Sequence, residues 1–149
     1  MLVGLIAWRC APEFVQDMLF PYLGGHWTGE IEFEDAEGNK VKHAATLDVV
    51  HTPTQIRFVL STDESSSETL MVHARKARPP SDIAKLVYIY EVERREGYAG
   101  AGDRYRGSAF VDVKTQPAKS MTGSYMAGKR SGTLRMTLKA ATPRWKIWG

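Results

Sequence analysis

The sequence is short of several features that mark common protein classes. Cys10 is the only cysteine among the 149 residues, which excludes an internal disulfide and favours a reducing, intracellular compartment. No Cys-x-x-Cys or His-Glu-x-x-His spacing is present. The four histidines fall on separate predicted strands or their ends, at positions 26, 43, 51 and 73. We therefore expect no metal site and no cofactor in a chain that has the length of one domain.

A hydrophobic run long enough to cross a bilayer is also missing. The apolar stretch Leu2–Trp8 is far shorter than the ~20 residues that span a membrane, and no basic residues precede it as they would in a signal peptide. Phe14, Met18 and Leu19 then recur with helical spacing between two prolines. We expect residues 1–23 to form a short helical segment that caps the next domain, or to be the remnant of a membrane helix, and residues 24–149 to form that domain.

Charge is distributed unevenly along the chain. Residues 1–93 carry 8 Lys/Arg and 14 Asp/Glu, whereas residues 94–149 carry 12 Lys/Arg and 3 Asp/Glu. A basic last part favours an anionic partner. The alternative is that these charges only keep a sheet surface soluble.

From Gly24 onward the hydrophobic pattern has a period of two, which is typical of β-strands. Turn-forming residues separate the alternating segments. No long helical pattern lies between them, so parallel crossover units are excluded. We expect eight strands, at residues 26–34, 41–50, 54–61, 68–76, 84–92, 106–114, 120–127 and 130–139.

Eight consecutive antiparallel strands suffice to close a barrel with room for side chains or one small ligand. The fold class predicted is therefore all-β, an eight-stranded up-and-down, lipocalin-like barrel. The segment Gly24–Trp27 leads into its first strand, where Trp27 is expected to plug the base and Gly29 to leave room beside it. In strands six and eight the face that points inward stays open, although placing the apolar sets inside would put Arg135 outside.

Five separated segments together resemble a known family. They are LGGHWTGEIE (23–32), LDVVHTPTQIRFVLSTDESSSETL (47–70), LVYIYEV (86–92), RYRGSAFVDV (104–113) and MTGSYMAGKRSGTLRM (121–136). In order and spacing they are similar to the SMODS-associating, two-transmembrane, β-strand-rich effectors of bacterial CBASS anti-phage systems. The resemblance covers about 115 residues, and this chain has His51 and Pro53 where the family tends to have Gln and then Trp.

The resemblance implies a barrel that senses a cyclic di- or oligonucleotide, assembles with itself and damages the inner membrane through its membrane helices. It implies no catalysis and no DNA or RNA polymer as partner. If an upstream membrane region exists, the expected location is the bacterial inner membrane, and otherwise it is the cytoplasm.

A cyclic nucleotide needs aromatic faces for its bases and Arg, Lys or hydroxyl donors for its phosphates. The residues expected to bind it are Ser65, Ser67, Tyr88, Tyr90, Arg104, Arg106, Tyr125, Lys129 and Arg130. In a meander the turns after strands one, three, five and seven share one end, so the serines and both basic clusters are expected at one mouth.

Other interpretations of these residues stay open. Tyr88 and Tyr90 are more typical of plain barrel core than of a ligand site. The segment DESSS is typical of a solvated turn, in which Asp63 and Glu64 would repel phosphate. The whole barrel could instead be a fatty-acid-binding or lipocalin-like carrier of an apolar ligand. A nitrobindin-like haem barrel with His43 or His51 on the iron is a further alternative.

Overall fold

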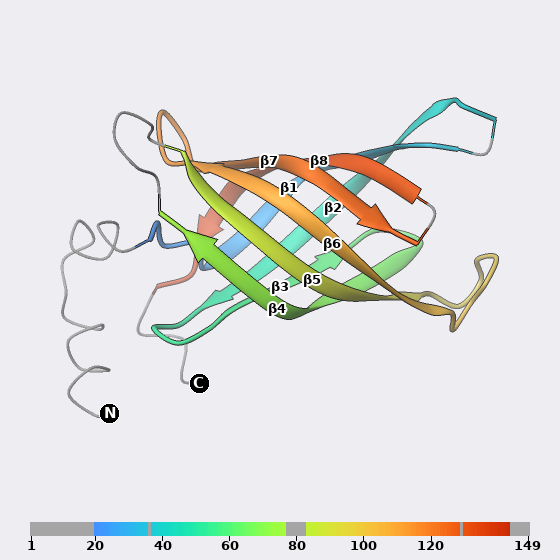
Figure 1. Cartoon of the computed structure of the whole chain (residues 1–149), viewed down its shortest axis with the longest axis horizontal. Helices are drawn as coiled ribbons and strands as arrows, with labels where there is room; N and C mark the ends of the chain where they lie inside the picture. The colour runs from blue at the N-terminus through green and yellow to red at the C-terminus, as the bar shows by residue number, and fades with distance from the viewer. Residues whose placement is uncertain (1–19, 36, 77–82, 129, 144–149) are drawn as a thin grey trace.

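A computed structural model describes residues 20–35, 37–76, 83–128 and 130–143. Eight strands follow one another, each antiparallel to the next, and the last pairs with the first to close a barrel (Figure 1). The strands are β1 (Gly25–Glu34), β2 (Lys40–His51), β3 (Ile56–Ser61), β4 (Ser65–Arg75), β5 (Ala84–Arg94), β6 (Arg104–Lys114), β7 (Ser120–Ala127) and β8 (Arg130–Ala141). The predicted eight-stranded, all-β, up-and-down barrel is confirmed.

Some predictions concern parts of the chain outside the described residues. The helical spacing of Phe14, Met18 and Leu19 lies there, and so does Lys129 of the last hairpin. Within the described ranges, no helix is long and apolar enough to span a bilayer.

The alternation along the strands places one set of side chains in a mainly apolar interior and the other set on the outer surface, as the period of two predicts. The two strands whose register stayed open follow the same rule. β6 buries Val111 and exposes Phe110, which is 54% accessible, while β8 buries Met136 and leaves Arg135 exposed. The apolar sets of both strands therefore face the interior.

One end of the barrel is closed by the residues that lead into β1. Trp27 is fully buried, and its indole Nε1 donates a hydrogen bond to the Leu23 carbonyl oxygen over 2.9 Å. Leu23 is itself fully buried, and its amide donates to Nδ1 of His51 on β2 over 3.1 Å. The Tyr22 hydroxyl donates to the Thr142 carbonyl oxygen beyond β8. Trp27 therefore plugs the base, as predicted, and ties the preceding segment across it.

The opposite end carries the hairpins after β1, β3, β5 and β7, and we call it the mouth (Figure 1). The hairpin between β3 and β4 corrects the expected strand boundary. The Thr62 amide donates to the Ser65 carbonyl oxygen over 2.9 Å, which makes Asp63 and Glu64 a two-residue tip. β4 thus begins at Ser65 and not at Glu68, because a turn closed by Thr62 leaves the serines free to pair with β5.

Candidate functional site

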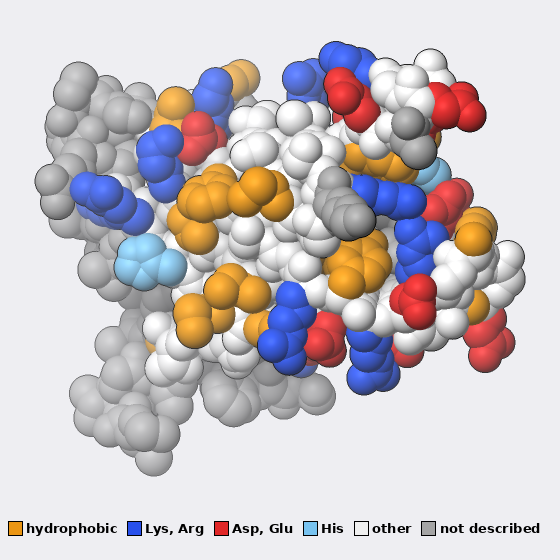
Figure 2. Space-filling view, turned by 45° about the vertical axis from the view of Figure 1, so that its right-hand side comes forward, with side chains coloured by type: hydrophobic (Ala, Val, Ile, Leu, Met, Phe, Trp, Pro, Cys, Tyr) orange, Lys and Arg blue, Asp and Glu red, His pale blue; other side chains and the backbone are white. Residues whose placement is uncertain are grey.

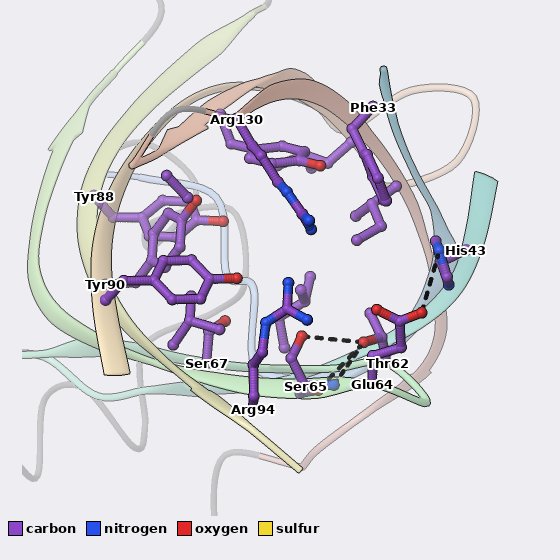
Figure 3. Close-up of a pocket in the computed structure, with 17 residues that line it drawn as sticks. Phe33, His43, Thr62, Glu64, Ser65, Ser67, Tyr88, Tyr90, Arg94 and Arg130 are labelled. Carbon is purple, nitrogen blue, oxygen red and sulfur yellow. Dashed lines mark hydrogen bonds and ion pairs between the residues drawn. The ribbon is translucent and has the colours of Figure 1, made fainter. Parts of the chain in front are cut away.

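A cavity opens at the mouth and runs into the barrel interior (Figure 3). Its walls combine aromatic rings, hydroxyl groups and a few charges. The aromatic and polar side chains that line it are Phe33, His43, Thr62, Glu64, Ser65, Ser67, Tyr88, Tyr90, Arg94, Tyr105, Tyr125 and Arg130. Such a mixture of apolar walls and a few convergent polar groups is typical of a small-molecule site.

Tyrosines form the aromatic part of the cavity, and glycines on neighbouring strands make room for them. The rings of Tyr88 and Tyr90 lie 5.5 Å apart between centroids. A Cβ atom at Gly107 on β6 would lie 2.5 Å from Tyr90, and one at Gly132 on β8 would lie 2.6 Å from the Tyr125 hydroxyl. Backbone carbonyl oxygens also lie close to both positions, that of Met126 at Gly107 and that of Glu32 at Gly132, so an alanine at either glycine would press on a neighbouring strand as well as on a tyrosine ring.

Burial raises the pH at which the phenols of this cavity ionise. It is the main cause that raises the pKa of Tyr88 and of Tyr90 far above the ordinary value of 10.0. Burial also raises the pKa of Tyr125 to about 12, with a further contribution from Tyr105 and an opposing one from Arg130. These hydroxyls therefore keep their protons, and can donate as well as accept hydrogen bonds, to a higher pH than exposed tyrosines do.

A spectroscopic titration checks these pKa shifts. We expect the folded chain at pH 11 to lack part of the 295 nm phenolate absorbance that its six tyrosines show when unfolded in guanidinium at the same pH. Because the unfolded chain loses these protons near pH 10, stability is retained below pH 10 and falls as the pH rises above it. Replacing Tyr125 with Phe should shrink the missing absorbance, and full ionisation at pH 11 in the folded state would contradict the buried placement.

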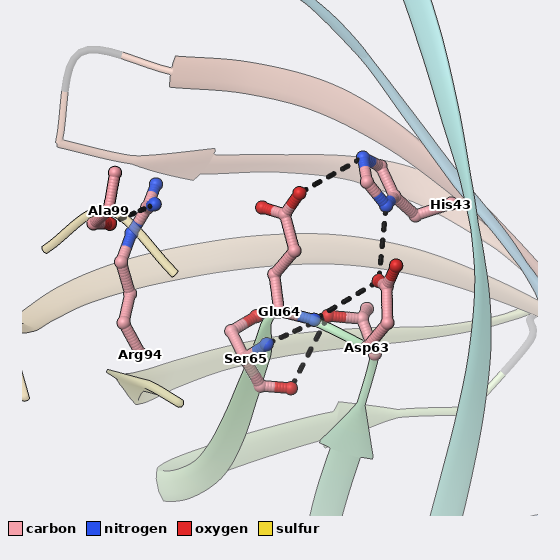
Figure 4. Close-up of polar contacts among 7 residues, drawn as sticks. His43, Asp63, Glu64, Ser65, Arg94 and Ala99 are labelled. Carbon is pink, nitrogen blue, oxygen red and sulfur yellow. Dashed lines mark hydrogen bonds and ion pairs between the residues drawn. The ribbon is translucent and has the colours of Figure 1, made fainter. Parts of the chain in front are cut away.

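Two arginines from different strands point into the cavity from opposite sides (Figure 3). Arg130 begins β8, and its guanidinium lies 5.6 Å from the ring centroid of Phe33 on β1. Arg94 ends β5, and its Nη1 donates to the Ala99 carbonyl oxygen in the β5–β6 loop over 2.8 Å (Figure 4). Neither guanidinium forms an ion pair with an acidic side chain among the described residues.

A histidine and two acidic side chains lie together at the edge of the cavity (Figure 4). His43 on β2 stacks on Phe33 with 5.4 Å between ring centroids, so the two faces of Phe33 are shared between His43 and Arg130. Nδ1 of His43 lies 3.2 Å from Asp63 Oδ1, and its Nε2 lies 4.0 Å from Glu64 Oε1. The hairpin tip after β3 is thereby attached to the wall formed by β1 and β2.

Six of the nine residues predicted from the sequence line this cavity. They are Ser65, Ser67, Tyr88, Tyr90, Tyr125 and Arg130. Their contact with a ligand stays a prediction. Lys129 lies outside the described residues.

The positions of Arg104 and Arg106 correct the expectation that they face a ligand at the mouth. Both lie on the outer surface, where Arg104 pairs with Glu93 at 3.2 Å and Arg106 pairs with Glu91 at 3.4 Å. Between them Tyr105 faces the cavity, because successive residues of a strand point to opposite faces. The same alternation, extended from Tyr90 to the end of β5, identifies Arg94 as an interior cation that the sequence analysis missed.

The histidines of the haem alternative lie at different ends of the barrel. His51 is buried at the base, where its Nδ1 accepts the Leu23 amide, while His43 lies in the cavity wall beside Asp63. Within the described ranges, no three His, Cys, Asp or Glu side chains gather in a group that could hold a metal ion.

A comparison with protein families finds a match over most of the chain. Residues 18–139 match the family described as Cap15, cyclic dinucleotide receptor domain. No curated protein matches the chain. The match spans β1 to nearly the end of β8 and includes the whole lining of the cavity. The chain therefore belongs to the Cap15 cyclic dinucleotide receptor domain family of CBASS effectors, in agreement with the resemblance seen in the sequence.

Proposed function

We propose that the chain is a cyclic-nucleotide sensor whose ligand occupies the mouth cavity. The observation that carries the proposal is the convergence of Arg94 and Arg130 inside a cavity walled by tyrosines (Figure 3). A cyclic dinucleotide has two phosphates and two bases, and the cavity offers two guanidinium groups and several aromatic rings. The family of the domain supports the same ligand class.

The two parts of such a ligand require different neighbours. Each phosphate accepts paired hydrogen bonds from the planar fork of an arginine, and serine or tyrosine hydroxyls add further donors. Bases gain roughly 1–3 kcal/mol each by stacking on aromatic side chains. Tyr105 and Tyr125 lie beside the arginines at the mouth, so stacking and phosphate contacts are available within one cavity. The proposed function is binding without catalysis, as expected of a receptor domain.

Self-association after ligand binding is a second part of the proposal. Exposed apolar side chains on the outer wall of β4–β7 support it, since groups of such side chains often mark contact sites between proteins (Figure 2). Met71 pairs across the sheet with Ile89, and Phe110 and Met126 continue the group onto β6 and β7. Membrane disruption as the output, and a location at the inner membrane, are supported by the effector resemblance alone.

Thermal melting against a panel of cyclic di- and trinucleotides tests the sensor. A ligand that binds the folded state at a hundred times its dissociation constant adds ~2.7 kcal/mol to the free energy of unfolding. For a domain of this size that is a rise of roughly 5–10 °C in Tm. Light scattering on the same samples should show a larger mass when the ligand is present.

Linear dinucleotides and fatty acids serve as the controls of this experiment. If no cyclic nucleotide shifts the Tm but a fatty acid does, the sensor proposal fails and the chain is better described as a carrier of apolar ligands. A Tm shift without a change in mass would keep the sensor and remove self-association from the proposal.

A further inference from the structure

Glu64 is an anionic group inside a cavity proposed to receive an anionic ligand. Its side chain is 35% exposed, and it lines the cavity together with Arg94 and Arg130. A carboxylate in this position repels a phosphate, so simple anion binding gives no reason for it. The ligand must bring hydrogen-bond donors to this wall if the carboxylate contributes to binding.

The carboxylate has unused acceptor capacity. Among the described residues, no amide or side chain donates a hydrogen bond to it, and its nearest basic partner is Nε2 of His43 at 4.0 Å. Its neighbour Asp63 differs, because Asp63 Oδ1 lies 3.2 Å from Nδ1 of His43 and accepts the Glu64 amide over 3.1 Å. The hairpin tip is thus held by Asp63, which leaves Glu64 available to a ligand (Figure 4).

The backbone of Glu64 is held in place as well. The Glu64 carbonyl oxygen accepts the Arg95 amide over 2.9 Å, which attaches the tip to the residue after Arg94. The backbones that carry the carboxylate and the Arg94 guanidinium are therefore attached to each other at the mouth. If a base of the ligand binds at Glu64, the phosphate of the same nucleotide lies in the cavity that Arg94 and Arg130 also line.

Nucleobases differ in what they present to a carboxylate. Guanine offers two adjacent donors, N1–H and the 2-amino group, which match the two oxygens of a carboxylate. Adenine presents one donor next to an acceptor, and uracil presents one donor between two carbonyl oxygens. Paired hydrogen bonds to a charged acceptor are the stronger and more selective kind.

We infer that Glu64 reads the Watson–Crick edge of guanine and makes the site prefer guanine-containing cyclic nucleotides. This inference rests on the proposed function, because it names the base that the sensor recognises. One barrel has no two-fold axis, so the two halves of a cyclic dinucleotide meet different walls, and a single guanine suffices.

Calorimetric titration of the full chain with cyclic di-GMP, cyclic di-IMP and cyclic di-AMP tests the inference. Hypoxanthine keeps N1–H and lacks the 2-amino group, so cyclic di-IMP should bind at least tenfold more weakly than cyclic di-GMP. Glu64→Gln replaces one acceptor by a donor, which suits the edge of adenine. This variant should lose at least tenfold in affinity for cyclic di-GMP and reverse the preference toward cyclic di-AMP.

Asp63→Asn provides the matched control, because it neutralises the neighbouring carboxylate and should leave the order of the three ligands unchanged. A reversal of preference cannot arise from a misfolded variant. If the unsubstituted chain binds cyclic di-AMP as tightly as cyclic di-GMP, or if Glu64→Gln keeps the original ratio, the role of Glu64 is refuted while the sensor stands. If no cyclic nucleotide binds, the proposed function itself fails and the inference fails with it.

Discussion

Replacing Arg130 with alanine is expected to weaken the binding of a cyclic dinucleotide about 10–100-fold. The guanidinium points into the cavity and forms no ion pair with an acidic side chain within the described ranges, so it is available to a phosphate. A hydrogen bond to a charged group contributes ~1.5–3 kcal/mol, and ~1.4 kcal/mol corresponds to a factor of ten in affinity. Arg94→Ala should have an effect of the same order, and calorimetric titration measures both.

Arg104→Ala and Arg106→Ala are the matched controls. Each removes the same side chain at the same end of the barrel, but from the outer surface, where it pairs with a glutamate of β5. Exposed pairs of this kind contribute ~0–1 kcal/mol to stability, so both controls should fold and bind like the original chain. Arg130→Lys keeps the charge without the planar fork, so its affinity for the ligand should lie between those of Arg130→Ala and the original chain. Equal losses at Arg104 and Arg130 would mean that the ligand binds outside the cavity.

The comparison of these four arginines shows how far alternation alone could identify the site. The period of two predicted which end of the barrel holds the serines and the basic residues, because turn parity is a property of any meander. It could also have separated Arg94 from Arg104. Arg94 has the parity of Tyr90, which faces inward, while Arg104 and Arg106 flank Tyr105 and share the outward face.

For Arg94 and Arg104 the error came from strand ends, where alternation was not extended far enough. β5 runs to Arg94, two residues beyond the expected end, and β6 begins at Arg104 and not at residue 106. The expected strands leave residues 93–105 in a loop, in which a side chain has no defined face, whereas Arg106 already begins the expected strand on the face opposite Ala109 and Val111. The length of the β5–β6 hairpin determines which face these residues occupy. Arg94 and Asp103 pair through their backbones, so strand pairing extends as far as Arg94 and the turn begins only after it.

Other features of the site depend on contacts that a pattern in the sequence does not contain. The attachment of the β3–β4 tip to His43 needs β2 and β3 to meet in a particular register. The stack of His43 on Phe33, with Arg130 over the other face, joins three strands that are distant in the chain. Glu64 could be placed in a turn from the sequence, but its exposure to the cavity follows only from this tertiary arrangement.

Trp27→Ala is expected to lower the free energy of unfolding by about 3–5 kcal/mol, the usual loss when a buried large aromatic is truncated in a core. Trp27 is fully buried, and its indole is the donor that ties Leu23 across the base. For a domain of this size the loss corresponds to a fall in Tm of roughly 6–20 °C. Differential scanning calorimetry measures it.

Phe110→Ala is the control for this truncation, because the same class of side chain is removed from a position that is 54% exposed. Its effect should stay within about 1 kcal/mol, as expected for a site away from the core. Trp27→Phe keeps most of the volume and loses the hydrogen bond to Leu23, so it should cost less than Trp27→Ala. Similar losses for Trp27→Ala and Phe110→Ala would contradict the role of Trp27 as the plug of the base.

The same variant also separates stability from ligand recognition. Trp27 lies at the base, while Arg94, Arg130 and Glu64 lie at the mouth, and the strands between the two ends remain paired in the folded state. At a temperature where Trp27→Ala is folded, its affinity for a cyclic dinucleotide should therefore equal that of the original chain. A loss of affinity in the folded variant would mean that the base and the mouth are coupled, and that ligand binding depends on the packing of the whole barrel.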